Sequence, residues 1–272
     1  MSFLEHLEEL RWHLVRSAFA VFIFATAAFI YKKVVFDIIL MGPSRSDFLT
    51  TELLCQFGHF FNDFLASYGR SFGSPEALCL NTEPIKLQSI QMAGQFLAHI
   101  KISVIAGIIG AFPYVVYELW LFIKPALYQK EKNHTRGAVF LVSFLFILGV
   151  LFGYFIISPL SINFLYNYQA SQQIVNNIQL MSFVSIVASI SLASGILFEL
   201  PAIIYFLSKV GIVTPEFLKK YRRHSLVVML VLSAIITPPD IFSQILVCLP
   251  LIVLYEISIK ISKRINKKAQ IA

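Results

Sequence analysis

The strongest chemical signal in this sequence is Glu199, an acid inside a long apolar segment. Residues 180–208 carry a single formal charge, that of Glu199, and Pro201 follows two positions later. At about 1.5 Å per helical residue, Glu199 lies roughly 15 Å from the end of this segment, near the middle of a hydrocarbon core about 30 Å thick. Because Pro201 cannot donate a backbone hydrogen bond, we expect the helix to be interrupted beside the acid.

A carboxyl group at that depth is costly unless it faces protein or a water-filled cavity, so it is a candidate functional group. We expect Glu199 to act as a polar anchor for a membrane segment of a partner or passenger. The alternative is a neutral glutamic acid that is hydrogen-bonded between two helices of the same chain.

Other chemistry-bearing motifs are almost absent. No Walker loop, glycine-rich nucleotide turn or zinc-ligand spacing occurs. Residues 69–73 match the G-x-S-x-G nucleophile motif, but no strand–turn–helix pattern surrounds them. His6 and Glu9 have a spacing seen in metal sites, which a charged helix face explains better. We therefore predict no enzyme activity, no bound metal and no cofactor.

The composition predicts an all-α polytopic membrane protein with one domain, residues 1–272. The chain is 57% hydrophobic and 14% charged, with a mean hydropathy of +0.75, which is far too apolar for a soluble domain. The net charge of +7 does not indicate nucleic-acid binding, because the basic residues cluster at the ends of apolar segments.

Six apolar segments are candidate transmembrane helices, and a long polar loop, about 42–91, separates the first two. The predicted spans are about 15–36, 96–123, 137–158, 180–208, 224–236 and 241–258. The last two are shorter than the usual twenty or so residues, which indicates a locally thin bilayer or shelter by protein. Residues 2–14 precede the first span with an apolar stripe, and predict either an amphipathic surface helix or a solvated lead-in.

Basic residues orient the chain. They crowd the N-terminus, residues 124–136, residues 209–223 and the C-terminal tail, whereas residues 158–179 and 237–240 have none. This distribution places both termini in the cytoplasm. Lys32, Lys33 and Lys101 fall on the opposite side, but the total bias outweighs them.

The long first loop carries two of the three cysteines, Cys55 and Cys79. On the exported side of a bacterial membrane the compartment is oxidising, so we expect a disulfide between them, with two free thiols as the alternative. The aromatic residues between them have near-helical spacing, which predicts a small helix held by the bridge.

Several stretches resemble TatC, the large subunit of the twin-arginine protein translocase. These stretches are residues 3–11 (FLEHLEELR), Pro113 with residues 117–131, residues 198–201 (FELP), and Arg222-Arg223 followed by residues 237–240 (TPPD). The similarity covers nearly the whole chain in order. Residues 45–85 depart from the family by their length, and Glu118 stands where the family often has glutamine.

The resemblance implies a cup-shaped six-helix bundle in the bacterial inner membrane that receives folded proteins whose signal peptides carry paired arginines. It implies single-span partners of the TatA and TatB types, self-association in a larger complex, and transport driven by the proton-motive force. In the family, signal recognition maps to positions that are Glu9, Arg11, Phe122 and Glu131 here. Carboxylates suit bidentate guanidinium binding, although Glu131 between two lysines could form only a surface ion pair.

The two short last spans are expected to bind a partner helix. Thr237 and Gln244, at their exported ends, are the predicted polar contacts.

The residues leave two other classes of protein open. A secondary transporter would also carry a mid-membrane acid, although no paired repeats are evident. An intramembrane enzyme would need a nucleophile with a base at bilayer depth, and no histidine faces Glu199.

Overall fold

A computed structural model of the chain describes residues 3–45, 47–66, 85–123, 135–171, 173, 176–236 and 241–271. Their helices are α1 Phe3–Ile30, η1 Lys33–Leu40, η2 Gly42–Ser44, α2 Leu49–Ala66, α3 Gly94–Ile123, α4 Thr135–Phe152, η6 Gly153–Ile157, α5 Ser158–Asn167, α6 Leu180–Phe198, α7 Leu200–Lys209, α8 Pro215–Lys220, α9 Arg222–Ile236 and α10 Ile241–Ile271. Two short strands, β1 Leu87–Gln88 and β2 Ile178–Gln179, pair in parallel.

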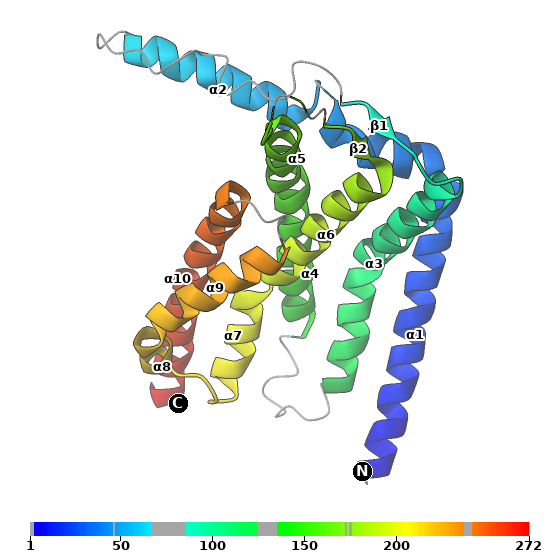
Figure 1. Cartoon of the computed structure of the whole chain (residues 1–272). Coiled ribbons are helices and arrows are strands. Elements are labelled where there is room, and N and C mark those ends of the chain that lie inside the picture. Colours follow the sequence, from blue (N-terminus) through cyan, green and yellow to red (C-terminus); the bar gives the residue numbers. More distant parts are fainter. Residues whose placement is uncertain are drawn as a thin grey trace.

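The helices form a bundle with distinct ends (Figure 1). The start of α1 and the end of α10 lie at one end, and α2, β1 and β2 lie at the other. In the described part of the chain, five helical segments are long and apolar enough to cross a membrane, and α9, with 15 residues, is shorter than these. The prediction of a mainly helical polytopic membrane protein is thus confirmed.

Helix α6 is the central element of the bundle. It contributes Ile190 to a core shared with α7, α9 and α10, and Phe183 to a second core shared with η1 and α3. Of its most apolar stretch, 56% is buried, against 11% for the corresponding stretch of α1. Helix α1 therefore lies at the edge of the bundle and packs mainly against α3.

The α4–η6 rod comes close to α6 because two glycines face it, Gly149 on α4 and Gly153 at the start of η6. A Cβ on Gly149 would lie 2.6 Å from the Ser194 carbonyl oxygen, and one on Gly153 would lie 2.8 Å from the Ser194 Cβ. Small residues at this spacing let two helix backbones approach inside a membrane. The contact fixes α4 against the centre of the bundle.

The fourth predicted span contains the expected interruption. Helix α6 ends at Phe198, Glu199 caps it, and α7 begins at Leu200 with Pro201 in its first turn. Proline is tolerated there because the first amides of a helix have no intrahelical acceptor. The break therefore lies beside the acid, as its position before the proline predicts.

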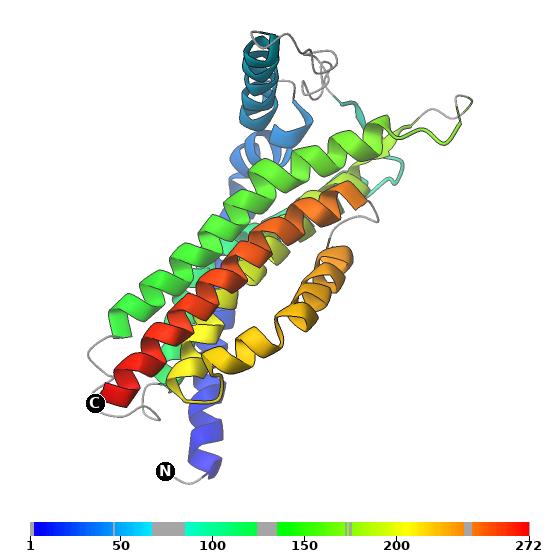
Figure 2. The same ribbon diagram turned by 90° about the vertical axis from the view of Figure 1, so that its left-hand side faces the viewer.

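Three helix boundaries in the structure differ from the predicted ones. The described residues 3–14 are helical but continue into the first span as α1, Phe3–Ile30, because no proline or glycine stops the helix. This excludes a separate surface helix and leaves the alternative, a lead-in to the first span. The third helix does not end at 158 but continues through η6 and α5 to Asn167, as one rod in Figure 2. Ser158 donates its hydroxyl to the Gly153 carbonyl at 2.9 Å, which satisfies an acceptor at this junction.

The last helix is not short. Helix α10 has 31 residues and includes Pro250, whereas the predicted span stopped at 258. That boundary was drawn at the basic tail, and charged residues end an apolar segment without ending a helix. Of the two short last spans predicted, only α9 is short.

Candidate functional site

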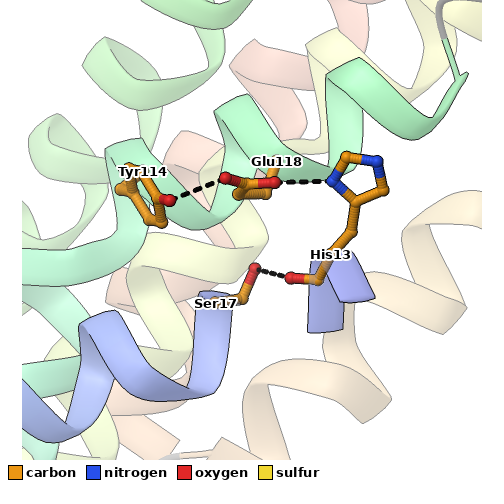
Figure 3. A network of polar contacts seen from close by, with 4 residues as sticks. All are labelled: His13, Ser17, Tyr114 and Glu118. Atoms are coloured by element: carbon orange, nitrogen blue, oxygen red, sulfur yellow. Dashed lines mark hydrogen bonds and ion pairs between the residues drawn. The ribbon is translucent and has the colours of Figure 1, made fainter. Parts of the chain in front are cut away.

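A buried polar cluster joins α1 to α3 (Figure 3). The Nδ1 atom of His13 lies 2.6 Å from Oε2 of Glu118, and the Tyr114 hydroxyl donates to Oε1 of Glu118 at 2.6 Å. The Ser17 hydroxyl donates to the His13 carbonyl at 2.8 Å. His13 and Glu118 are only 8% and 3% exposed, so both partners are removed from solvent and lipid.

This cluster fixes the angle between two helices. His13 and Glu118 are 105 residues apart in the sequence, yet their side chains form a hydrogen bond with each other. Leaving one member of such a pair unpaired is strongly unfavourable, which restricts α1 to the position where both are satisfied. The cluster thereby holds the N-terminal helix against the end of α3.

Two predicted signal-binding residues flank this cluster. Glu9 lies one turn before His13 on α1, on the same helix face. Its Oε2 is buried and has no hydrogen-bond partner among the described residues. Phe122 lies one turn after Glu118 on α3, and its ring meets the His13 ring edge-on with centroids 6.3 Å apart. The structure thus brings Glu9 and Phe122 to adjoining surfaces at one end of the bundle.

The other two predicted signal-binding residues are not part of this arrangement. Arg11 is exposed, and its guanidinium lies 5.9 Å from the centre of the Trp12 ring. Two positions from Glu9, it points away from the face that Glu9 shares with His13. Glu131 lies outside the described residues.

Glu199 is buried at the junction of α6 and α7. It is 8% exposed, and neither carboxyl oxygen has a hydrogen-bond partner among the described residues. The backbone amide of Phe146 on α4 faces the carboxyl group without reaching hydrogen-bond geometry. Among the described residues, the Phe146 amide is thus a donor on a neighbouring helix that faces Glu199, and both the polar-anchor prediction and the interhelical alternative stay open.

One of the two predicted partner-contact residues, Gln244, lies near the start of α10. Gln244 is partly buried, and its side-chain amide donates to the Leu230 carbonyl of α9 at 3.1 Å. That bond ties α10 to α9. Thr237 lies outside the described residues.

The cysteine on α2 forms a disulfide bond. Cys55 is disulfide-bonded and half-buried, while its predicted partner Cys79 lies outside the described residues, so the pairing stays a prediction. Within the described ranges, no group of three or more histidine, cysteine, aspartate or glutamate side chains could hold a metal ion.

His13 and Glu118 are the site residues that the sequence interpretation missed. Glu118 was noted only as a departure near the end of a span. A charged residue inside an apolar segment requires a partner, and this rule predicts that Glu118 pairs with another polar group. It does not identify His13, because no local spacing relates two residues on different helices.

Comparison with known proteins places this geometry in a family. Residues 5–250 match the family described as Sec-independent protein translocase protein (TatC). The Sec-independent protein translocase protein TatC of Blattabacterium sp. subsp. Periplaneta americana is 41% identical over 268 residues, which cover 98% of this chain and 97% of the relative. That of Aquifex aeolicus is 35% identical and covers 98% of this chain and 97% of its own.

A solved structure agrees with the sequence comparison. A crystal structure of the twin-arginine translocase receptor TatC superposes with a TM-score of 0.70 at 34% identity, covering 96% of this chain and 99% of that one. The family match, the relatives and the fold lead to one conclusion: the chain belongs to the TatC family of Sec-independent protein translocase components, and is a multi-pass membrane protein of a transport family.

Proposed function

We propose that this protein is the receptor subunit of a twin-arginine translocase and that it binds the paired arginines of signal peptides on folded proteins. The observation that carries the proposal is the Oε2 atom of Glu9, which is buried without a hydrogen-bond partner in the described part of the chain, on a helix that the His13–Glu118 pair holds in place. A guanidinium offers parallel N–H donors that match a carboxylate. An acid with a free acceptor at a fixed position is the complement that an arginine requires.

Glu131 supplies the second acid in this proposal, and Phe122 supplies an apolar surface beside Glu9. Arginine is preferred to lysine because the planar fork can bind a carboxylate through two bonds, whereas an ammonium is a point charge. Arg11, exposed on α1, is proposed to contact acidic or polar groups at the rim of the site.

The membrane part of the proposal concerns partners. Glu199 is the polar anchor for a segment of a TatA- or TatB-type single-span subunit or of the passenger, because its carboxyl is buried and accepts no well-formed hydrogen bond from the residues that the structure describes. Thr237 and Gln244 contact a partner helix at the exported end. The assembly exports folded cargo with the proton-motive force across the bacterial inner membrane, and this chain has six spans, a cup-shaped bundle and both termini in the cytoplasm.

A pull-down with an immobilised signal peptide tests the receptor proposal. The detergent-solubilised protein is passed over a peptide with paired arginines and over a matched peptide with paired lysines. We expect retention on the first and little on the second. Glu9→Gln and Glu131→Gln should each reduce retention by about tenfold, the loss of roughly 1.4 kcal/mol expected for a charge-assisted bond.

Glu216→Gln is the matched control, because Glu216 is an exposed acid in the first turn of α8. It should be retained like the unmodified protein. Equal retention on the two peptides, or full retention of the Glu9 and Glu131 variants, would contradict the assignment.

A further inference from the structure

An apolar cavity of about 410 Å³ lies between α3, the α4–η6 rod and α6, and η1 closes one end of it. Its lining side chains are apolar except for Tyr154 and Ser191. The Tyr154 hydroxyl donates to the Ile39 carbonyl at 2.5 Å and the Ser191 hydroxyl to the Val187 carbonyl at 2.7 Å. Because the lining leaves no free donor, water gains little by entering, and the cavity suits an apolar occupant.

The cavity opens to the outside of the bundle. Ile39 of η1 and Leu151 of α4, which line it, are 44% and 48% exposed, whereas Leu40 and Val187 at its back are buried. Since α3, α4 and α6 belong to the apolar segments, this mouth faces the hydrocarbon region. An occupant can therefore enter from the bilayer.

A more polar depression adjoins the same mouth. It is lined by Arg45, Asp47 and Phe48 together with Ile39, Tyr154 and Phe155, and the last three also line the apolar cavity. Arg45 and Asp47 are both exposed, and one guanidinium nitrogen of Arg45 donates to the Asp37 carbonyl at 2.8 Å. The two depressions thus place a cation and an anion beside the opening of an apolar cavity.

The size of the cavity selects among membrane occupants. One turn of an α-helix, 5.4 Å long and 10–12 Å wide, fills roughly 420–610 Å³. The cavity could hold about one such turn, so it cannot seat a transmembrane helix. A narrow, flexible hydrocarbon chain does fit, and its volume lies within the roughly 300–1,000 Å³ of ligand pockets.

We propose that this composite site binds one aminophospholipid of the bilayer, with an acyl chain in the apolar cavity. Its phosphate lies against Arg45 and its primary ammonium against Asp47, so that both charges of a zwitterionic headgroup meet an opposite charge. The acyl chain then packs between η1 and the helices α3, α4 and α6, where protein side chains leave a cavity.

Photolabelling tests the proposal on the full chain reconstituted in lipid nanodiscs. The discs contain phosphatidylcholine and a small share of phosphatidylethanolamine with a diazirine in its acyl chain, and labelled peptides are mapped by mass spectrometry. We expect labels on the segments that contain Ile105 and Leu151. Ala106→Phe, which fills the cavity, should reduce this label by about tenfold.

Ala27→Phe is the matched control, because Ala27 is exposed on α1 and does not line the cavity. It should label like the unmodified protein. Leu151→Trp at the mouth provides a second blocking variant that does not enlarge a buried side chain. Equal labelling of both blocking variants and the control, or label spread evenly over all lipid-facing helices, would overturn the proposal.

A comparison of two labelled lipids tests the headgroup assignment separately. A diazirine-labelled phosphatidylcholine lacks the N–H donors of the primary amine and should label the site less than phosphatidylethanolamine does. Asp47→Asn should remove that preference, and Arg45→Gln should weaken both labels. Equal labelling by the two lipids in the unmodified protein contradicts the headgroup assignment, and displacement of the label by a signal peptide assigns the cavity to the passenger instead.

Discussion

Glu118 depends on His13 for its place inside the protein. The carboxyl accepts from Tyr114 and pairs with His13 at 2.6 Å, and both members of the pair are buried. Removing one partner from a buried pair typically costs roughly 3–5 kcal/mol, because the remaining charge is uncompensated. We therefore expect His13→Leu to lower the free energy of unfolding by about that amount, measured by denaturant unfolding in detergent.

The control is the double variant His13→Leu with Glu118→Gln. A neutral amide can still accept from Tyr114 and leaves no buried charge, so this variant should recover part of the lost stability. A double variant as unstable as His13→Leu alone would show that packing, and not charge pairing, holds α1 against α3.

Substitutions of Glu199 should affect export and thermal stability in different directions. Its carboxyl is buried without a hydrogen-bond partner among the described residues, and an unsatisfied buried polar group costs about 1–3 kcal/mol. Glu199→Leu should therefore keep or raise the thermal stability of the protein while export of a folded reporter falls. Glu199→Gln retains a polar side chain and should be milder in export. Full export by the leucine variant would exclude the polar-anchor role.

These two acids differ in how far the sequence reveals them. The helix break at Glu199 is predictable, because a proline follows the lone charge of this apolar segment, whereas its depth in the bilayer stays a prediction. The His13–Glu118 pair is not predictable from local spacing, because its members lie 105 residues apart. Nothing in the linear pattern states that α1 and α3 are neighbours.

At the scale of elements, the α4–α6 contact depends on the absence of a side chain at Gly149. An added Cβ there would meet the Ser194 carbonyl at 2.6 Å and Phe198 at 2.7 Å, and a backbone oxygen cannot move aside cheaply. Gly149→Val should therefore lower the midpoint of thermal unfolding, since overpacking costs about 1–3 kcal/mol or more. Gly137→Val on the same helix is the control, because a Cβ there would lie within 4 Å of no other element in the described part of the chain.

Helix α2 gives a second element-scale prediction. Cys55 on α2 is disulfide-bonded and Cys248 is a free buried cysteine. If the partner is Cys79, alkylation of denatured, unreduced protein should modify Cys248 alone, and prior reduction should expose all three cysteines of the chain. A bridge that closes about two dozen residues contributes about 3 kcal/mol. Alkylation of every cysteine without reduction would refute the bridge.

The ends of the helices show which sequence signals set an element. The break at Glu199 follows from a proline, and the cap of α8 follows from Thr214, whose hydroxyl accepts from the Phe217 amide at 3.2 Å. The start of α1 and the end of α10 lie beyond the boundaries predicted from the charge pattern, because charged residues do not break the backbone of a helix. Charges report where a helix leaves the membrane, and helix formation continues past that point.

At the scale of the whole molecule, the number of membrane crossings depends on α9. The described start of α1, the described end of α10 and the basic helix α8 lie at the same end of the bundle, while α2 lies at the other (Figure 1). If α8 and the end of α10 are on one side of the membrane, α9 must cross. Its 15 residues give a helix of about 22 Å at about 1.5 Å per residue.

A helix of that length is about 8 Å shorter than a hydrocarbon core of about 30 Å. The mismatch costs fractions of a kcal/mol per Å, which a locally thinned bilayer can absorb. We therefore expect α9 to span the membrane with Tyr221 near the cytoplasmic surface and Ile235 near the exported surface. Both side chains are exposed on the bundle, at 39% and 75% respectively, so a cysteine at either position is accessible to a reagent.

Labelling of single-cysteine variants with a membrane-impermeant maleimide tests this topology. In intact cells with a permeabilised outer membrane, Ile235→Cys and Tyr168→Cys should react, and Tyr221→Cys and Lys263→Cys should react only after the inner membrane is opened. Tyr168, an exposed residue at the end of α5, and Lys263 on α10 serve as the two side references. Reaction of Ile235→Cys only after the inner membrane is opened, together with reaction of Lys263→Cys in the intact cells, would mean that α9 does not cross and that the chain has five spans with its termini on opposite sides.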